Sequence, residues 1–159
     1  MLEMCSNCII NIKSAKDKYS AFEEIVNNCS VFDVIEDKNA FINAIKVREE
    51  LQSTGIGHGV AIAHGKIAKL DKPLVALGLF EEGLYFDDVY PEKVKLVFII
   101  ASSPSCQTEY VATLGSMLRM IHDKKLRDEL KNKEFENITC HHFLELFAKG
   151  YFKEKKGSK

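Results

Sequence analysis

His64 is the residue of this chain whose type and position are best suited to chemistry. It follows a short apolar stretch, residues 60–63, and precedes Gly65, close to the glycine-dense segment 53–59. In α/β proteins functional groups gather where strands end and loops begin. A histidine there can act as a nucleophile, an acid–base group or a ligand. Position alone leaves a structural role equally open.

Arg48 is the second candidate, because the helical period from Phe41 and Ile45 leads to it. One interpretation is that its stem covers the core while its charged end stays in water. The other is that its guanidinium is aimed at an anion, since its planar donors match phosphate geometry. The N-terminus of a helix expected after Ser105 would favour anions as well, although every helix has this property.

The glycine segment does not predict a nucleotide site. It lacks the GxxxxGK[ST] pattern, and it precedes a strand where a dinucleotide motif would follow one. We therefore expect neither ATP nor NAD, no other cofactor, and no metal that the protein itself requires.

The five cysteines are odd in number and irregularly spaced, which is not typical of a disulfide framework. We expect free thiols. The alternative is a zinc site that combines the CxxC pair, Cys5 and Cys8, with Cys140 and His141. It is disfavoured because adjacent residues on a helix point in different directions.

Apolar periodicity predicts an α/β fold, in which a mixed sheet is flanked by helices on both faces. Segment 94–101 is continuously apolar, as expected of a strand buried on both faces. Strands are expected at 8–12, 60–63, 74–80 and 94–101, and helices at 15–28, 38–51, 107–121, 126–131 and 139–149.

The 159 residues fit a single domain, 1–159, in which 151–159 form a charged C-terminal tail. The formal net charge of −1 lacks the basic excess of a nucleic-acid binder. No apolar stretch reaches the length of a membrane span, and the N-terminus does not resemble a secretory signal. We therefore expect no nucleic-acid partner, no membrane insertion and a cytoplasmic location.

Segment 48–64, which reads REELQSTGIGHGVAIAH, closely resembles the active-site stretch of the fructose/mannitol-type enzyme IIA domains. These belong to the bacterial phosphoenolpyruvate-dependent sugar phosphotransferase system, and the nitrogen-regulatory members share the pattern. The resemblance continues through 83–87, 94–100 and the helix from Glu109, and covers about residues 18–147. The family fold is also a mixed sheet with helices on both sides.

The resemblance implies that a histidine phosphocarrier protein phosphorylates His64. The phosphoryl group would then pass to a IIB domain or serve as a regulatory mark. Arg48 corresponds to the family's active-site arginine, and the matched positions Thr54 and Gly57 are expected to help bind the phosphoryl group. His58, in the glycine segment, either helps to bind this group or is a solvent-facing loop histidine.

The sequence departs from the family pattern at two positions. Ala63 replaces the usual proline before the active histidine, which loosens the local backbone at most. Tyr110 replaces a second active-site histidine; its hydroxyl can donate to a phosphoryl oxygen but cannot carry positive charge.

Three functions follow from these features. The first is a working phosphoryl carrier, expected to be free-standing or regulatory because no fused IIB or membrane domain is recognised. The second is a degenerate, IIA-like regulatory protein that binds a partner without phosphotransfer, which Tyr110 supports. The third is a hydrolase with a Cys/His or His/Asp pair, which is disfavoured because no GxSxG motif is present.

Overall fold

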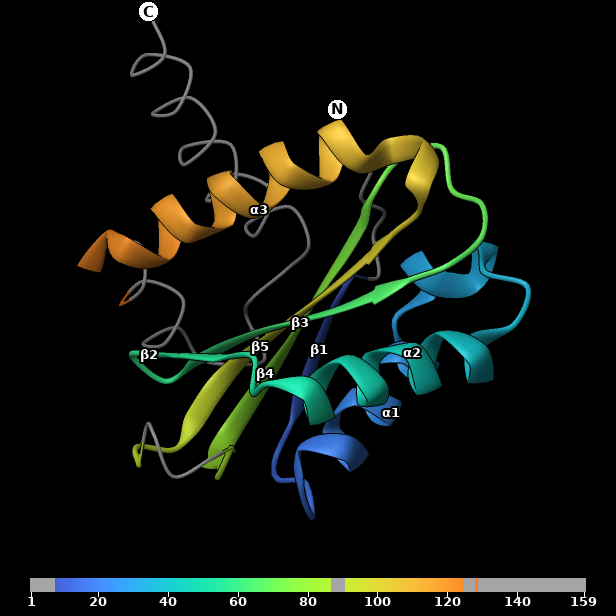
Figure 1. The fold of residues 1–159 in the computed structure, drawn as a ribbon. Coiled ribbons are helices and arrows are strands. Elements are labelled where there is room, and N and C mark those ends of the chain that lie inside the picture. The colour runs from blue at the N-terminus through green and yellow to red at the C-terminus, as the bar shows by residue number, and fades with distance from the viewer. Residues whose placement is uncertain (1–7, 87–90, 125–127, 129–159) are drawn as a thin grey trace, which may run out of the picture.

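The computed structural model describes residues 8–86, 91–124 and 128. Its helices are α1, α2 and α3, with two short 3-10 helices, η1 and η2, and its strands are β1 to β5 (Figure 1). The elements run β1 Ile9–Ile12, α1 Lys18–Asn28, η1 Ser30–Val34, α2 Lys38–Leu51, β2 Gly55–Gly57, β3 Val60–Lys66, β4 Leu74–Leu84, β5 Val94–Ser102, η2 Pro104–Cys106 and α3 Gln107–His122.

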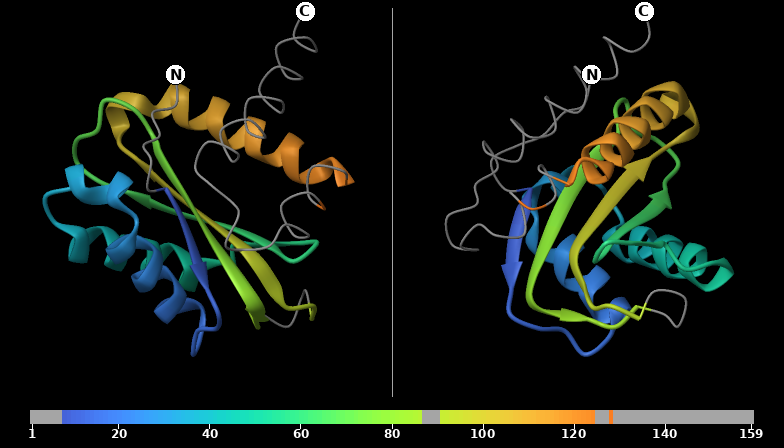
Figure 2. Two further views of the ribbon diagram at one scale, coloured as in Figure 1. Left: turned by 180° about the vertical axis from the view of Figure 1, so that it is seen from behind. Right: turned by 90° about the vertical axis from the view of Figure 1, so that its left-hand side faces the viewer.

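The five strands form one mixed sheet in the order β1-β4-β5-β3-β2. β1 is parallel to β4 and β3 to β5, whereas β4–β5 and β2–β3 are antiparallel. α1 and α2 lie on one side of the sheet and α3 on the other (Figures 1 and 2). This confirms the predicted fold class.

Alternation along the strands decides which residues meet which helix. A Cβ on Gly65 would collide with Phe41 and Ile45 of α2, so Gly65 faces α2. His64, its neighbour in β3, therefore faces the opposite side, where α3 lies, and its ring stacks on that of Tyr110.

β5 occupies the centre of the sheet, and its residues from Leu96 to Ser102 are all buried. This confirms the strand predicted to be buried on both faces.

Two aspartates fix where the first helices begin. The side chain of Asp17 accepts a hydrogen bond from Ser20 N at 2.8 Å, and that of Asp37 accepts one from Ala40 N at 3.0 Å. Such N-cap bonds satisfy amide groups that the helix leaves free. The bounds of α2 are as predicted, whereas α1 begins at its cap, three residues later than expected.

The glycine segment folds differently from the loop we expected. Gly55–Gly57 forms the edge strand β2, and the backbone of Gly57, His58 and Gly59 turns at positive φ values of 86°, 59° and 75°. Glycine adopts such values without steric cost, which lets β2 return tightly into β3.

β3 is also longer than predicted, because its parallel ladder with β5 continues from His64 to Lys66. His64 therefore lies within a strand rather than at its end.

The expectation of thiols was right for Cys29 and Cys106, which are buried and form no disulfide. It was wrong for Cys8, which is disulfide-bonded. Irregular spacing argues against a framework of bridges, but it does not prevent a single pair from meeting in space.

The helices predicted at 126–131 and 139–149 lie outside the described residues. Among the residues that are described, no helix is long and apolar enough to cross a membrane. The same part of the chain contains no group of three His, Cys, Asp or Glu side chains that could hold a metal ion. The absence of a metal requirement stays a prediction.

Candidate functional site

Two neighbours determine the orientation of the His64 ring. Its Nε2 lies 2.7 Å from the hydroxyl oxygen of Ser102, which is fully buried at the end of β5. The ring of Tyr110, in the first turn of α3, stacks on the imidazole with centroids 4.3 Å apart and planes 16° from parallel. The hydrogen bond restrains the rotation of the ring and the stack restrains its plane.

The environment of His64 keeps its imidazole neutral. Burial, and then the positive charges of Lys66 and Arg48, lower the pKa of His64 to about 4. The ordinary value is about 6.5, so a free histidine would be partly protonated near neutral pH. Here the ring keeps a nitrogen lone pair throughout the physiological range, as a nucleophile requires.

This low pKa predicts how the stability of the protein responds to pH. In the unfolded chain His64 binds a proton below about pH 6.5, whereas in the folded protein it does so only near pH 4. The unfolded state therefore binds more protons between these values, and stability falls as the pH falls through this window.

We expect the melting temperature of the parent protein to fall more steeply from pH 7 to pH 4.5 than that of His64→Gln. Carboxylates titrate in both proteins, so the difference between the two curves isolates His64. Parallel curves would contradict the shifted pKa.

Arg48 lies in the last turn of α2 and is exposed. Its Nη1 donates to the carbonyl oxygen of Gln52 at 2.9 Å. Its charge acts on both rings of the stack: it contributes to the low pKa of His64, and it opposes the rise that burial causes in the pKa of Tyr110. The structure thus stacks Tyr110 on His64 and leaves both rings within the electrostatic influence of Arg48, while the roles of these residues in phosphoryl transfer stay a prediction.

The short edge strand helps explain how the charge of Arg48, on the other side of the sheet, can act on His64. β2 pairs with β3 only at Val60 and Ala61, and Thr54 O accepts from Ile62 N at 3.1 Å. Beyond that point the edge of β3 is not covered by β2, so β2 does not separate His64 from the charge of Arg48.

The other predicted site residues come from the segment between α2 and β3. Thr54 is buried and its hydroxyl donates to the carboxylate of Glu49. Gly57 and His58 form the turn before β3, and Val60 is separated from His64 by about 13 Å of extended strand. A role for Thr54, Gly57 or His58 in phosphoryl binding stays a prediction.

Three residues around the site were not expected from the sequence: Ser102, Lys66 and Glu49. Lys66 has a signal in the sequence, because it is two residues from His64 and shares its face of β3. Glu49 has one too: the spacing Phe41, Ile45, Glu49 leads along the buried face of α2. Ser102 has none, because its contact with His64 depends on the pairing of β3 with β5.

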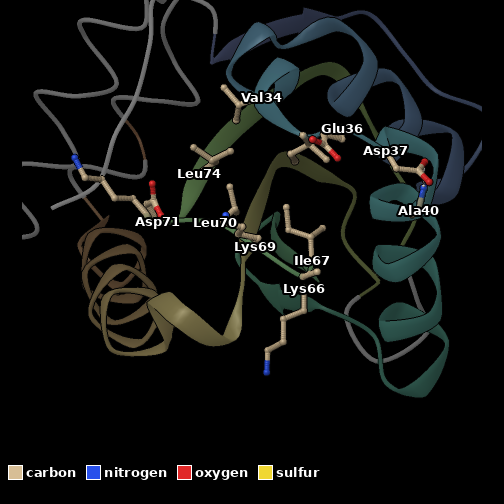
Figure 3. A pocket seen from close by; sticks show the side chains of 13 residues that line it. Val34, Glu36, Asp37, Ala40, Lys66, Ile67, Lys69, Leu70, Asp71 and Leu74 are labelled. Atoms are coloured by element: carbon tan, nitrogen blue, oxygen red, sulfur yellow. Dashed lines mark hydrogen bonds between the residues drawn. The ribbon is translucent and has the colours of Figure 1, made fainter.

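A separate pocket of about 720 Å³ opens beyond Lys66. Figure 3 shows apolar side chains at its wall: Val34 at the end of η1, and Ile67 and Leu70 on the connection from β3 to β4. Its charged lining residues are of both signs, so no ligand charge is favoured: Glu36, Asp37, Lys66, Lys69, Asp71 and Lys72.

Comparison with known proteins identifies the family of the chain and agrees with its fold. The family model described as "Phosphoenolpyruvate-dependent sugar phosphotransferase system, EIIA 2" matches residues 4–141. The chain therefore belongs to the EIIA type 2 family of the phosphotransferase system.

The chain is similar in sequence both to fructose-specific components and to nitrogen regulatory proteins. The chain is 30% identical to the fructose-specific EIIABC component of Bacillus subtilis over 128 residues. This alignment covers 80% of this chain and 20% of that protein. The chain is 31% identical over 112 residues to the nitrogen regulatory protein of Escherichia coli, which covers 68% and 67%. The chain thus spans about a fifth of the Bacillus protein, and it covers 65% of the fructose-specific EIIA component of Haloferax volcanii.

Solved structures share the fold. The nitrogen regulatory protein IIA-Ntr of Neisseria meningitidis superimposes with a TM-score of 0.76 at 21% identity, covering 92% of this chain and 95% of that one. The Escherichia coli complex of enzyme IIAMTL with phosphorylated IIBMTL gives a TM-score of 0.71 at 20% identity, covering 93% and 99%.

Proposed function

We propose that this protein is a phosphoryl carrier in which His64 accepts the phosphoryl group from the phosphohistidine of a histidine phosphocarrier protein. The group then passes to a IIB partner or remains as a regulatory mark. The observation that carries this proposal is the surroundings of His64: a neutral imidazole, held by Ser102 and Tyr110, with two cationic side chains acting on it.

The charges of Arg48 and Lys66 support this function in two ways. They oppose protonation of His64, which preserves the nucleophile. They also favour the negative charge that a phosphoryl group brings, and charge-assisted hydrogen bonds to such a group are about twice as strong as neutral ones.

The reaction needs little beyond positioning. A ring nitrogen of His64 donates its lone pair to phosphorus while the bond from phosphorus to the donor's ring nitrogen breaks. That electron pair returns to the donor imidazole, which gains one proton while the phosphorylated His64 ring loses the proton of its other nitrogen. The transfer therefore balances without a metal or cofactor from this protein. Negative charge on the equatorial oxygens is the quantity to be stabilised.

Exposed apolar side chains flank the proposed site and suit the docking of a protein donor. Leu51 and Val47 lie on α2 beside Arg48, and Val111 follows Tyr110 on α3; Leu51 is 80% exposed. A mixture of apolar and cationic groups around a reactive side chain is typical of a protein–protein interface.

The competing function is a regulatory protein that binds partners through this surface without phosphotransfer. Tyr110 is the observation that favours it, because a neutral phenol cannot supply the charge of a protonated histidine. Burial raises the pKa of Tyr110, so its hydroxyl remains protonated and neutral.

Variants at Tyr110 test the two functions. In the carrier function, Tyr110→His keeps or raises the rate at which His64 accepts phosphate, because imidazole can stack and can be charged. Tyr110→Phe keeps the stack and lowers the rate only a few-fold, about the effect of one neutral hydrogen bond. The rates are measured with a phosphorylated histidine carrier protein as donor.

Melting temperatures measured in parallel are the control. If Tyr110 only covers the core, Tyr110→Phe leaves transfer unchanged and Tyr110→His lowers stability alone. Acceptance of phosphate by none of these proteins, the parent included, from any competent donor would favour the binding function.

A further inference from the structure

Glu49 is a buried carboxylate that the proposed transfer does not use. The residue is 2% exposed and lies on α2 immediately after Arg48. Because neighbouring helix positions point in different directions, Arg48 reaches solvent while Glu49 enters the interior. A buried charge is costly unless it is paired and hydrogen-bonded, so its partners must compensate.

The carboxylate of Glu49 accepts hydrogen bonds from three donor groups, which belong to Lys18 and Thr54. Its Oε2 accepts from Lys18 Nζ and from Thr54 N, each at 3.0 Å, and its Oε1 accepts a short hydrogen bond from the hydroxyl of Thr54. Lys18 comes from α1, and its side chain is only 16% exposed. The ion pair with Lys18 therefore joins α1 to α2, and the two bonds from Thr54 join α2 to the segment that follows it.

These bonds fix both ends of the turn that leaves α2. Glu49 holds Thr54 at the far end, while Arg48 donates to Gln52 O at the near end. The turn at Gln52 and Ser53 is thus held by the side chains of two consecutive helix residues, Arg48 and Glu49. A displacement of Thr54 would move the carbonyl that orients the guanidinium of Arg48.

We propose that Glu49 is a positioning residue for Arg48: through Thr54 it fixes the Gln52–Ser53 turn, and this turn aims the Arg48 guanidinium toward His64. Lys18 neutralises the buried carboxylate. The effect on transfer rests on the proposed phosphoryl-carrier function, whereas the effect on the geometry of Arg48 does not.

A double-mutant cycle tests this coupling. The parent, Glu49→Ala, Arg48→Ala and the double variant are compared for the rate of phosphoryl acceptance. We expect Glu49→Ala to lower the rate about tenfold when Arg48 is present and less than about twofold in the Arg48→Ala background. Equal losses in both backgrounds would show that Glu49 only supports the fold, and would overturn the proposal.

The pKa of His64, followed by NMR in the same four proteins, gives a second readout that needs no phosphate. Removing the Glu49 carboxylate has the same direct electrostatic effect on His64 in both Arg48 backgrounds, so it cancels in the cycle. We expect Glu49→Ala to shift the pKa of His64 further upward when Arg48 is present than when it is absent, because the loss of Glu49 lets the charge of Arg48 move away from His64. The absence of this difference would overturn the proposal, even if the parent accepts phosphate. Conversely, a parent that accepts none refutes the carrier function while this cycle still decides the role of Glu49.

Two further variants keep the test decisive. Thr54→Val removes only the donated hydroxyl and replaces Glu49→Ala in the cycle if Glu49→Ala does not fold. Thr54→Ser keeps a hydroxyl and should show parental values.

Glu23→Gln is the matched control, because Glu23 pairs with Lys46 at 3.1 Å between the same two helices, but on the surface. A change in transfer or in the pKa of His64 in Glu23→Gln as large as that in Glu49→Ala would contradict a specific role for Glu49.

Discussion

Replacing Arg48 by alanine is expected to lower the rate of phosphoryl acceptance by His64 about a hundredfold. Loss of one preorganised charge-stabilising donor typically costs about 10²–10³ in rate. Arg48 is exposed, so its removal should change the melting temperature little. Rates from single-turnover transfer with a phosphorylated histidine carrier, measured beside melting curves, check both statements.

Arg48→Lys is the informative control. It keeps the charge but loses the planar set of donors that matches phosphate geometry. We expect a rate between those of the parent and Arg48→Ala. A rate in Arg48→Ala within about threefold of the parent, smaller than the usual cost of such a donor, would remove Arg48 from the proposed mechanism.

Gly65→Ala is expected to produce the second large effect, this time on both stability and transfer. The added Cβ would lie 2.7 Å from Phe41 Cε1 and 2.8 Å from Ile45 Cγ1, so α2 must move away from β3. Overpacking of a core typically costs about 1–3 kcal/mol. Because α2 carries Arg48, the same movement should lower the rate of acceptance by His64. Denaturant unfolding and the transfer assay measure the two effects.

Gly78→Ala offers a matched control on the same side of the sheet. Its Cβ would lie 2.6 Å from Ile25 Cδ1, so the clash is with α1 and not with α2. We expect a loss of stability with transfer retained under conditions where the variant is folded. Equal losses of transfer in both glycine variants would mean that α2 does not position Arg48 through this contact.

Local patterns were sufficient for most of the fold. The apolar run of β5, the bounds of α2 and the helix of α3 were all visible in the sequence because each depends on burial along a single element. β2 was missed because glycines are poor strand formers and the strand exists only through its pairing with β3.

The burial of individual helix residues was harder to predict. Leu51 and Val111 are large apolar residues of α2 and α3, yet they are 80% and 58% exposed. Both lie near the proposed site, where a docking surface would account for apolar exposure. Conversely Glu49 occupies the buried position after Ile45, which its charge concealed and its partners from α1 and Thr54 explain.

The site itself was predictable only in part. The order of residues along 48–64 indicated His64 and Arg48, because the family resemblance resides in that stretch. The hydrogen bond of His64 to Ser102 and its stack on Tyr110 join segments about forty residues apart, and they arise from the β3–β5 pairing and the placement of α3. No local pattern contains that information.

The most direct test of the carrier function is to locate the phosphate. The parent protein and His64→Gln are incubated with a phosphorylated histidine carrier, and acid-labile phosphate is then mapped by mass spectrometry under neutral conditions. We predict one phosphate on His64 in the parent and none in His64→Gln. Phosphate on His58, His122, His141 or His142 of the intact parent, or its undiminished presence in His64→Gln, would contradict the account.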